Sequence, residues 1–409
     1  FSREVPTGLV EGVCEPEWAG VADAFVENFT ARGEVGASVC VTVDGRPVVD
    51  LWGGKADLKR EIPWNRDTVG VVYSCTKGAV ALIAGMLAER GVLDLDAPVT
   101  ELWPEYGAHG KEYTTPRMML DHTAGVPAFR EPVPEGGFAD WEQMTARIAA
   151  EPPFFEPGTR SAYHAYNFAW TIGEVIRRAT GKTAGQLLAE EIAGPLGLDF
   201  WLGTPEEVEP RVARLLPAKR NPGGMLGRAA LAIVEDNQSI PALFYFHNGG
   251  FNANRREYKA AEIGSANGVT NARSLARMYA ALANGGELDG VRLVRPETIA
   301  AMRRITNATH CDATLRTPLR FGAGFMRSCD RRHLKDPPDD SMLLGAHAFG
   351  HSGAGGSIGF ADPQPRMSFA YTMNRMAADQ ELNARRNAVV DAAYRALGYT
   401  STASGAWTR

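Results

Sequence analysis

Hydrophobic positions along the chain follow two periods, one typical of strands and one typical of helices. Alternation of apolar with small or polar residues predicts strands near both ends, at residues 37–43, 47–52, 322–327, 356–361 and 366–373. Asp44 and Gly45 predict a tight hairpin between the first two strands, and Asp362 with Pro363 predicts a turn between the last two. Helical spacing at 16–33 and at about 380–397 adds a helix before these strands and another after them. We therefore expect the chain to open with a helix and an antiparallel pair.

The middle of the chain has mainly helical spacing. Helices are predicted at residues 74–90, 115–127, 140–150, 167–180, 184–192 and 272–284. Residues 217–254 are rich in Gly, Pro and Asn and predict a long loop that shapes a substrate cleft. Together these elements predict an α+β fold, in which residues 1–72 and 312–409 form an α/β lobe with an antiparallel sheet flanked by helices. Residues 73–311 are expected to form a mainly helical lobe, with the site in the cleft between the lobes.

Composition and charge exclude several classes of protein. The 409 residues are 44% hydrophobic and 22% charged, which suits one large domain with a sizeable core. The formal net charge is −5 and no basic stripe interleaves with aromatic residues, so nucleic acid is not an expected partner. The longest apolar run, residues 79–87, is far shorter than the roughly 20 residues that cross a bilayer. The first residues lack the pattern of a signal peptide, so no membrane association is expected.

The five cysteines are Cys14, Cys40, Cys75, Cys311 and Cys329. Their number is odd, they are widely scattered, and none forms a Cys-x-x-Cys pair. This distribution predicts reduced thiols and a cytoplasmic location. The sequence leaves the oligomeric state open.

The richest chemistry lies in Ser74-Cys-Thr-Lys77, at the start of the predicted helix 74–90. At a spacing of i, i+3 on a helix, the Ser74 hydroxyl and the Lys77 amine can touch. A serine hydroxyl becomes a good nucleophile when a neighbouring base takes its proton, and a lysine kept neutral by its surroundings can be that base. The pattern is short enough to arise by chance, so the hypothesis depends on partners elsewhere in the chain.

Two further stretches supply such partners. The first is Gly158-Thr-Arg-Ser-Ala-Tyr163-His-Ala-Tyr-Asn, and the second is Phe349-Gly-His351-Ser-Gly353-Ala-Gly-Gly. In order and spacing, these stretches and Ser74-Cys-Thr-Lys77 resemble the serine β-lactamase and penicillin-recognising enzyme family. The likeness is greater to its carboxylesterase branch, the family VIII esterases related to class C β-lactamases. It runs from about residue 20 to the C-terminus and also includes Leu120-Asp-His122-Thr-Ala-Gly125.

The resemblance implies a role for each motif. Ser74 would be the nucleophile, Lys77 its base and Tyr163 the second member of the proton relay. His351, Ser352 and Gly353 would form a third motif on an edge strand, where they would bind substrate. The family likeness also puts the oxyanion in the backbone N–H groups of Ser74 and Ala354. No cofactor and no metal are expected.

Two departures from the family pattern change the expected substrate. Penicillin-directed members have Tyr-x-Asn where this chain has Tyr163-His-Ala, so the amide expected to bind a β-lactam side chain is absent. Their third motif is usually Lys-Thr-Gly, whereas this chain has His351 in place of the lysine. A weakly charged imidazole attracts a carboxylate much less than an ammonium does. Both departures favour simple uncharged esters over β-lactams or D-Ala peptides.

Tyr163 also has a physical rationale apart from the resemblance. A phenol becomes useful in proton transfer when a nearby ammonium favours its ionised form, and Lys77 could provide that charge. The alternative is that Tyr163 is one aromatic residue among several in a core, with Tyr166 as a rival one helical turn away. For His351, a structural histidine on a strand is an equally good interpretation.

Other kinds of site are less well supported. Gly350-His-Ser352-Gly-Ala resembles a nucleophile elbow, but an α/β-hydrolase needs a histidine later in the chain and none follows His351. His347 and His351 have the spacing of metal ligands on a helix, but the glycines between and after them oppose a helix there. Cys75 follows the proposed nucleophile directly and should point away from the cleft into the core.

The sequence thus predicts a serine carboxylesterase that hydrolyses short-chain carboxylic esters through an acyl-enzyme on Ser74. The alternatives on the same scaffold are acyl transfer to an alcohol or amine, and weak β-lactam or amide cleavage. A third possibility from a different class is a catalytically silent protein that binds a ligand. The expected partner is a small-molecule ester.

Overall fold

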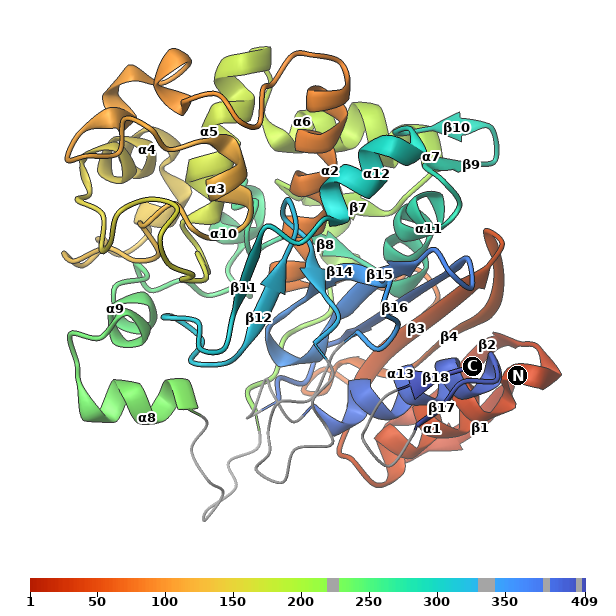
Figure 1. Cartoon of the computed structure of the whole chain (residues 1–409). Helices are drawn as coiled ribbons and strands as arrows, with labels where there is room; N and C mark the ends of the chain where they lie inside the picture. Colours follow the sequence, from red (N-terminus) through yellow and green to blue (C-terminus); the bar gives the residue numbers. More distant parts are fainter. Residues whose placement is uncertain (219–227, 330–342, 378–382, 402–406) are drawn as a thin grey trace.

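A computed structural model describes residues 1–218, 228–329, 343–377, 383–401 and 407–409 (Figure 1). Among these residues, one eleven-stranded sheet has the order β1-β2-β4-β3-β16-β15-β14-β13-β12-β11, with β5 paired to β4. Its strands are β1 Ser2–Val5, β2 Gly8–Cys14, β3 Gly36–Val43, β4 Arg46–Asp57, β5 Ile62–Pro63, β11 Asn307–Thr309, β12 Leu319–Phe321, β13 Met326–Arg327, β14 Phe349–Ser352, β15 Ile358–Asp362 and β16 Met367–Met373. Every pair in this sheet is antiparallel.

The helices lie on both faces of this sheet and form a separate group above it in Figure 1. The α-helices are α1 Ala19–Thr30, α2 Thr76–Glu89, α3 Pro116–Leu120, α4 Trp141–Ala150, α5 Phe168–Thr180, α6 Ala184–Leu187, α7 Gly194–Leu196, α8 Arg228–Glu235, α9 Ile240–Phe246, α10 Arg256–Ala260, α11 Ala272–Ala283, α12 Pro296–Arg303 and α13 Ala384–Ala396. The 3-10 turns are η1 Pro16–Trp18, η2 Tyr73–Cys75, η3 Val99–Glu101, η4 Pro104–Gly107, η5 Gly137–Ala139, η7 Glu206–Arg211 and η8 Ala354–Gly356, and η6 Leu188–Ala193 is a π-helix. Small ladders join β6 Gly70–Val71 and β7 Phe200–Trp201 to β8 Val269–Thr270, β9 Glu287–Leu288 to β10 Val291–Arg292, and β17 Thr400–Ser401 to β18 Trp407–Thr408.

Strands from the N-terminal and C-terminal parts of the chain meet in the centre of the sheet. There β3 pairs with β16 from Ala37↔Met373 to Val43↔Met367. Buried hydroxyl groups face each other across this pair, with 2.7 Å between Ser38 Oγ and Thr372 Oγ1. Helices α1 and α13 cover one face of the sheet and α11 lies on the other (Figure 1). The predicted α+β fold, with an antiparallel sheet built from both ends, is therefore confirmed. The division into lobes at residues 72 and 312 stays a prediction.

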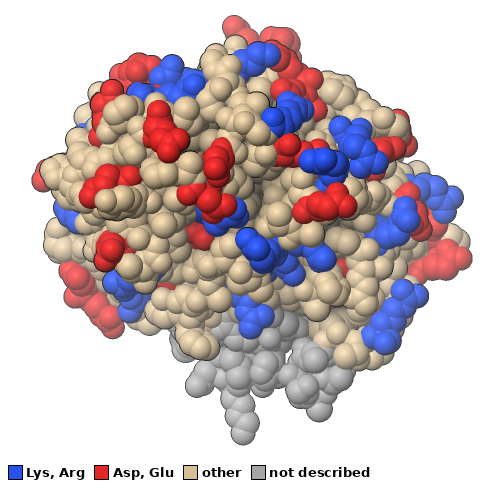
Figure 2. Space-filling view, turned by 45° about the horizontal axis from the view of Figure 1, so that its top comes forward, with Lys and Arg blue, Asp and Glu red and all other residues tan. Residues whose placement is uncertain are grey.

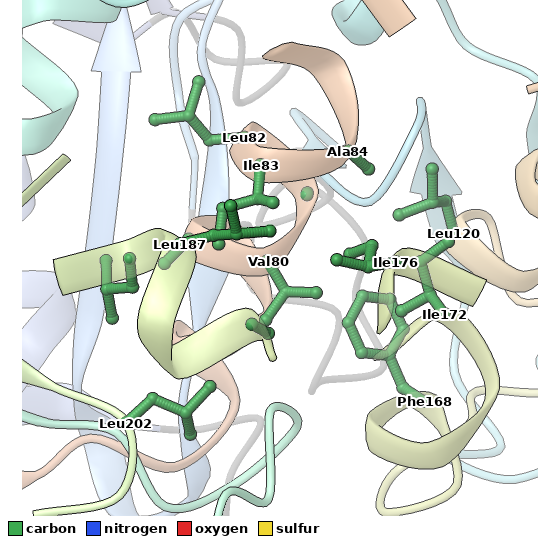
Figure 3. Close-up of a cluster of buried hydrophobic side chains, with 14 of the residues drawn as sticks. Val80, Leu82, Ile83, Ala84, Leu120, Phe168, Ile172, Ile176, Leu187 and Leu202 are labelled. Atoms are coloured by element: carbon green, nitrogen blue, oxygen red, sulfur yellow. The ribbon is translucent and has the colours of Figure 1, made fainter. Parts of the chain in front are cut away.

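Helix α2 forms the centre of the helical region. Every residue from Thr76 to Leu87 is buried, so the helix is enclosed on all sides and is not the amphipathic element that its apolar spacing predicts. Figure 3 shows its side chains packed against Leu120, Phe168, Ile172 and Leu187 from α3, α5 and α6. A helix enclosed in this way gives its first turn a fixed position, which is where Ser74 and Lys77 lie.

Several predicted elements occur where the sequence places them. The predicted helices at 140–150, 167–180 and 272–284 correspond to α4, α5 and α11. Asp140 and Asn271 cap α4 and α11, since their side chains accept from the backbone N–H groups of Gln143 and Ser274. In the predicted hairpin, Asp44 and Gly45 both have positive φ, of 51° and 80°.

Other predictions of secondary structure are wrong. The chain opens with the β1–β2 hairpin and not with a helix; most side chains of these strands are exposed, so they show no clear apolar alternation. Of the predicted strand 322–327, only Met326–Arg327 is a strand, β13; residues 322–325 form the turn between β12 and β13, in which Gly322 N donates to Phe325 O. The predicted long loop 217–254 contains helices α8 and α9, and its residues 219–227 lie outside the described part. The last predicted helix, at about 380–397, is in contrast confirmed as α13 from Ala384 to Ala396, and its predicted first residues lie among 378–382, outside the described part.

On the face shown in Figure 2, Lys and Arg side chains alternate with Asp and Glu side chains, without a continuous patch of one sign. Among the described residues, none of the helices is both long and apolar enough to cross a membrane.

Candidate active site

Ser74 lies in the short turn η2, immediately before α2, with its side chain partly exposed. The residue before it, Tyr73, has φ of +46°, a conformation that is unfavourable for a residue with a side chain. Two hydrogen bonds hold this turn: Val72 N donates to Gly268 O at 2.9 Å, and Thr76 Oγ1 donates to Tyr73 O at 2.6 Å. The strained turn therefore presents Ser74 at the end of a buried helix.

Lys77 is completely buried, and its amine has three polar contacts. Nζ lies 3.1 Å from Ser74 Oγ and 2.8 Å from each of the carbonyl oxygens of Ala165 and Ser265. Burial lowers the pKa of Lys77 well below its usual value, so the neutral amine is favoured. A neutral amine has two N–H groups and one lone pair. Because the two carbonyls can only accept, they take the N–H groups and leave the lone pair for the Ser74 hydroxyl.

Tyr163 lies next to this pair, although 85 residues or more separate them in the sequence. Lys77 Nζ is 4.8 Å from the centre of the Tyr163 ring, and the ring is buried. Burial raises the pKa of the Tyr163 hydroxyl, and a hydrogen bond with Ser74 lowers it in part. The rival residue, Tyr166, has its ring against Phe244 and Phe251 instead. The fold therefore brings Ser74, Lys77 and Tyr163 together, as the motif order implies.

The expectation that Lys77 would favour ionised Tyr163 is wrong. Burial raises the pKa of Tyr163 well above its ordinary value, and the Ser74 hydrogen bond opposes this only in part. The same burial lowers the pKa of Lys77 and so disfavours the ammonium that would stabilise a phenolate. Tyr163 is thus a neutral phenol that can carry a proton, beside a neutral amine that can accept one.

A buried carboxylate, Asp312, holds the segment that carries Tyr163. Its Oδ1 accepts from the backbone N–H groups of Tyr163, Thr314 and Leu315, at 3.1, 2.9 and 2.9 Å. Its Oδ2 accepts from Ser161 Oγ at 2.8 Å. Desolvation raises the pKa of Asp312, and these donors oppose that shift. The sequence analysis missed Asp312, because no local motif links it to Tyr163.

Three histidines pack around the same tyrosine. The His122 ring lies 4.5 Å from Tyr163 between ring centres, and the His351 ring lies 6.0 Å away. His164 N donates to His122 Nδ1, and Val126 N donates to His164 Nε2. Burial lowers the pKa of His164 and of His351 to about 3 and that of His122 well below its usual value. All three imidazoles are therefore neutral near pH 7.

His351 lies in β14, which pairs with both β13 and β15. The expectation of an edge strand is therefore wrong. The His351 side chain is 1% exposed and its Nδ1–H donates to Ser352 O at 2.7 Å. This placement behind Tyr163 favours support of the tyrosine over direct contact with substrate, and the substrate-binding role of His351, Ser352 and Gly353 stays a prediction.

The loop with the predicted oxyanion donor lies directly against the Ser74 turn. Cys75 Sγ donates to His351 O at 3.3 Å, with Cys75 buried in the core as expected. A Cβ atom added to Gly353 would lie 2.1 Å from Val72 O, so only glycine allows β14 to pass this close. The next residue, Ala354, begins the short turn η8. The oxyanion role of the Ser74 and Ala354 N–H groups stays a prediction that this proximity makes reasonable.

A buried ion pair contacts this loop through the Gly355 carbonyl oxygen. Arg385 Nη1 lies 2.8 Å from Glu34 Oε1, and the two side chains are 7% and 0% exposed. Arg385 Nη2 donates to Gly355 O at 3.3 Å, and Asn383 Nδ2 donates to the same oxygen at 2.9 Å. The ion pair thus connects the chain after α1 with the start of α13 and fixes the loop next to Ala354. No sequence signal pointed to it.

Replacing Glu34 by alanine is expected to destabilise the protein by about 3 kcal/mol, because Arg385 would stay buried without its counter-ion. Urea denaturation would measure the change in the free energy of unfolding. The control is Arg3→Ala, which removes an exposed pair with Asp23 at 3.8 Å and should cost less than about 0.5 kcal/mol. Equal effects of the two substitutions would contradict a stabilising role of the buried pair.

The structure gives little support to the nucleophile elbow or the metal site that the sequence also suggested. Ser352 Oγ donates weakly to Met326 Sδ at 3.6 Å, and β14 leads into the turn η8 and not into the helix of a nucleophile elbow. His347 Nδ1 contacts Arg303 Nη1 at 3.3 Å. In the described ranges, no group of three or more His, Cys, Asp and Glu side chains could hold a metal ion.

Comparisons with known proteins show what the whole chain is similar to. The family model described as Beta-lactamase matches residues 22–394. The chain is 37% identical to the esterase/beta-lactamase LipL of Mycobacterium tuberculosis, over 90% of this chain and 83% of that protein. A crystal structure of a family VIII carboxylesterase is 39% identical, covers 95% of this chain and 99% of its own, and has a TM-score of 0.83. A penicillin-binding protein homolog from Caulobacter crescentus is 36% identical, with the same coverage and a TM-score of 0.84.

Proposed function

The chain belongs to the beta-lactamase family and is a serine hydrolase, and we propose that it hydrolyses short-chain carboxylic esters through an acyl-enzyme on Ser74. The observation that carries this proposal is the 3.1 Å contact between Lys77 Nζ and Ser74 Oγ, with both N–H groups of the amine directed to carbonyl oxygens. This arrangement supports a lysine that takes the serine proton.

The reaction begins when Lys77 accepts the Ser74 proton and Oγ attacks the ester carbonyl carbon. The negative charge develops on the carbonyl oxygen, where the backbone N–H groups of Ser74 and Ala354 would stabilise it. Tyr163 donates its proton to the leaving alcohol and regains one from Lys77, so the C–O bond breaks and the acyl-enzyme remains. Water then loses a proton to the same relay, attacks the acyl carbon and releases the acid.

The neutral state of the site supports uncharged esters as substrates. His351 stands where penicillin-directed relatives have a lysine, and burial lowers its pKa to about 3, so it provides no positive charge for a substrate carboxylate. Burial also lowers the pKa of Lys77, which favours its neutral form. β-Lactam cleavage is the second candidate, because LipL, at 37% identity, is named as both an esterase and a beta-lactamase. Acyl transfer, the silent ligand-binding alternative and the absence of a cofactor stay predictions from the sequence.

Activity on p-nitrophenyl esters from acetate to octanoate, measured beside a chromogenic cephalosporin, tests this proposal. We expect the highest kcat/KM for the shorter acyl groups, with an initial burst of p-nitrophenol when deacylation is slow. The cephalosporin should react at least about 100-fold more slowly, since one missing charge contact with its carboxylate costs that much. Faster turnover of the cephalosporin than of every ester would favour the β-lactamase alternative.

Cys14, Cys40, Cys75 and Cys311 are free thiols, which supports the proposed cytoplasmic location.

A further inference from the structure

Four aromatic side chains form a continuous row that begins at Tyr73, the residue before Ser74, and that we call the aromatic wall: Tyr73, Phe251, Tyr166 and Phe244. Ring centres are 6.5 Å apart between Tyr73 and Phe251, 5.4 Å between Phe251 and Tyr166, and 5.5 Å between Tyr166 and Phe244. All four side chains are only partly buried. Each residue of the wall therefore keeps part of its surface accessible to a bound molecule.

The wall is attached to the same residues that hold the reactive pair. Tyr73 directly precedes Ser74, and Tyr166 directly follows Ala165, whose carbonyl accepts from Lys77 Nζ at 2.8 Å. Ser265 uses its Oγ to donate to Tyr166 O at 2.8 Å, while its own carbonyl accepts from Lys77 Nζ at 2.8 Å. The position of the wall relative to the nucleophile is thus set by backbone contacts of the site itself.

Other aromatic residues fix the wall from behind. The buried Phe138 ring lies 5.1 Å from Tyr166 and 6.2 Å from Phe251 between ring centres. Tyr258 packs against Phe251 at 5.1 Å, and its hydroxyl donates to Gly249 O at 2.8 Å. These contacts hold the rings before substrate arrives, so little conformational entropy is lost on binding.

The wall has no charge. Burial raises the pKa of Tyr73 to about 12 and also raises that of Tyr166, so both are neutral phenols at working pH. Phe244 and Phe251 add only apolar rings. Aromatic rings pack most favourably with other rings, in offset or edge-to-face geometry. A planar aromatic group gains this contact, whereas a flexible alkyl chain gains only burial of area and loses more rotamer freedom.

We propose that the aromatic wall binds an aryl group of the ester, so that the enzyme prefers aryl esters over linear alkyl esters of equal carbon count. This inference rests on the proposed esterase function and names the substrate class of that site. The aryl group can come from the acyl side or from the alcohol side of the ester, and the experiment distinguishes the two.

The test compares matched pairs of esters in a proton-release assay. On the acyl side, methyl phenylacetate is compared with methyl octanoate, which has the same number of acyl carbons. On the alcohol side, phenylethyl acetate is compared with octyl acetate. We expect kcat/KM to be about tenfold higher for the aryl member of at least one pair, which corresponds to one favourable ring contact. The pair that shows this preference identifies which side of the ester meets the wall.

Substitutions assign the preference to the wall. Phe251→Leu and Phe244→Leu keep apolar bulk but remove the ring, and each should reduce the aryl-to-alkyl ratio of kcat/KM by about threefold. Phe246→Leu is the matched control, since Phe246 lies in the same helix as Phe244 but is 59% exposed and outside the wall. The control should leave the ratio unchanged. An unchanged ratio in both wall variants, or equal rates for both members of each pair, would overturn the proposal.

A binding measurement separates this proposal from the esterase function. Calorimetric titration of Ser74→Ala with methyl phenylacetate and methyl octanoate reports affinity without turnover. Preferential binding of the aryl ester that Phe251→Leu abolishes would support the wall even if the wild-type protein hydrolysed neither ester. Hydrolysis of both esters with no difference in rate or affinity would refute the wall and leave the esterase function intact.

Discussion

Ser74→Ala is expected to lower kcat/KM for p-nitrophenyl acetate by at least about 10⁴-fold, the loss typical of removing a catalytic serine. Without Oγ no acyl-enzyme can form, and the remaining activity would come from polarisation of the ester carbonyl alone. Ser74 is partly exposed and its side chain is small, so the substitution leaves no large cavity. Steady-state kinetics and intact mass after treatment with an organophosphate would measure the effect, since only a reactive serine is labelled.

The matched control for this prediction is Ser352→Ala. Ser352 belongs to the Gly350–Ala354 stretch that resembles a nucleophile elbow, and its hydroxyl contacts Met326 Sδ. Its loss should change kcat/KM by less than about tenfold, because Ser352 Oγ takes no part in the proposed covalent step. Equal activity of Ser74→Ala and wild type, or labelling of Ser352 in place of Ser74, would refute the assignment of the nucleophile.

Local patterns were enough to predict the part of the site that lies in one turn of chain. Ser74 and Lys77 are three residues apart, and a helix start brings such residues together whatever the rest of the fold does. The 3.1 Å contact between them is therefore a local result. Tyr163 and the His351 stretch could be placed near them only through resemblance to a family, because no local rule predicts contacts over such separations.

The residues that hold the site in place could not be predicted in this way. Asp312 binds the Tyr163 backbone across 149 positions, and Arg385 reaches Glu34 across 351. Side chains of these types are common on surfaces, and nothing in their neighbours marks them as buried. The ionised form expected for Tyr163 was also wrong, because the direction of a pKa shift depends on burial, which raises the pKa of this phenol. Burial lowers the pKa of Lys77, in line with the neutral lysine that a base requires.

Errors in secondary structure have a similar cause. The alternation in 322–327 comes from Gly322 and Gly324, which imitate the small residues of a strand, but Gly324 has φ of +78° and belongs to a turn. The apolar stripe of α2 predicted one buried face, whereas tertiary packing encloses the whole helix. Buried helices of this kind are recognised from their surroundings more than from their own spacing.

Lys77→Met is expected to lower kcat/KM by about 10³-fold, since loss of a general base typically costs between 10² and 10⁴. Methionine keeps the length of the side chain but has no amine to take the Ser74 proton. Lys77→Arg should be at least as inactive, because a guanidinium stays charged and cannot accept a proton. Lys111→Met is the matched control: Lys111 is also buried, and its Nζ donates to the Ala149 and Glu151 carbonyls, but it has no contact with Ser74. That variant should lose stability while its folded fraction keeps wild-type kcat.

The pH dependence of the wild-type enzyme gives an independent test of Lys77. The base acts only when deprotonated, so kcat/KM should fall as pH drops through the Lys77 pKa, with a slope of one. Burial places this pKa well below the ordinary value for lysine, so the active form is present on the neutral and alkaline side of the titration. The imidazoles of His164 and His351, with pKa values of about 3, contribute no step near pH 6.5. The residual activity of Lys77→Met should not show this fall in kcat/KM at low pH, which we call the acid limb. An unchanged limb in that variant would assign the titration to another group and remove Lys77 from the role of base.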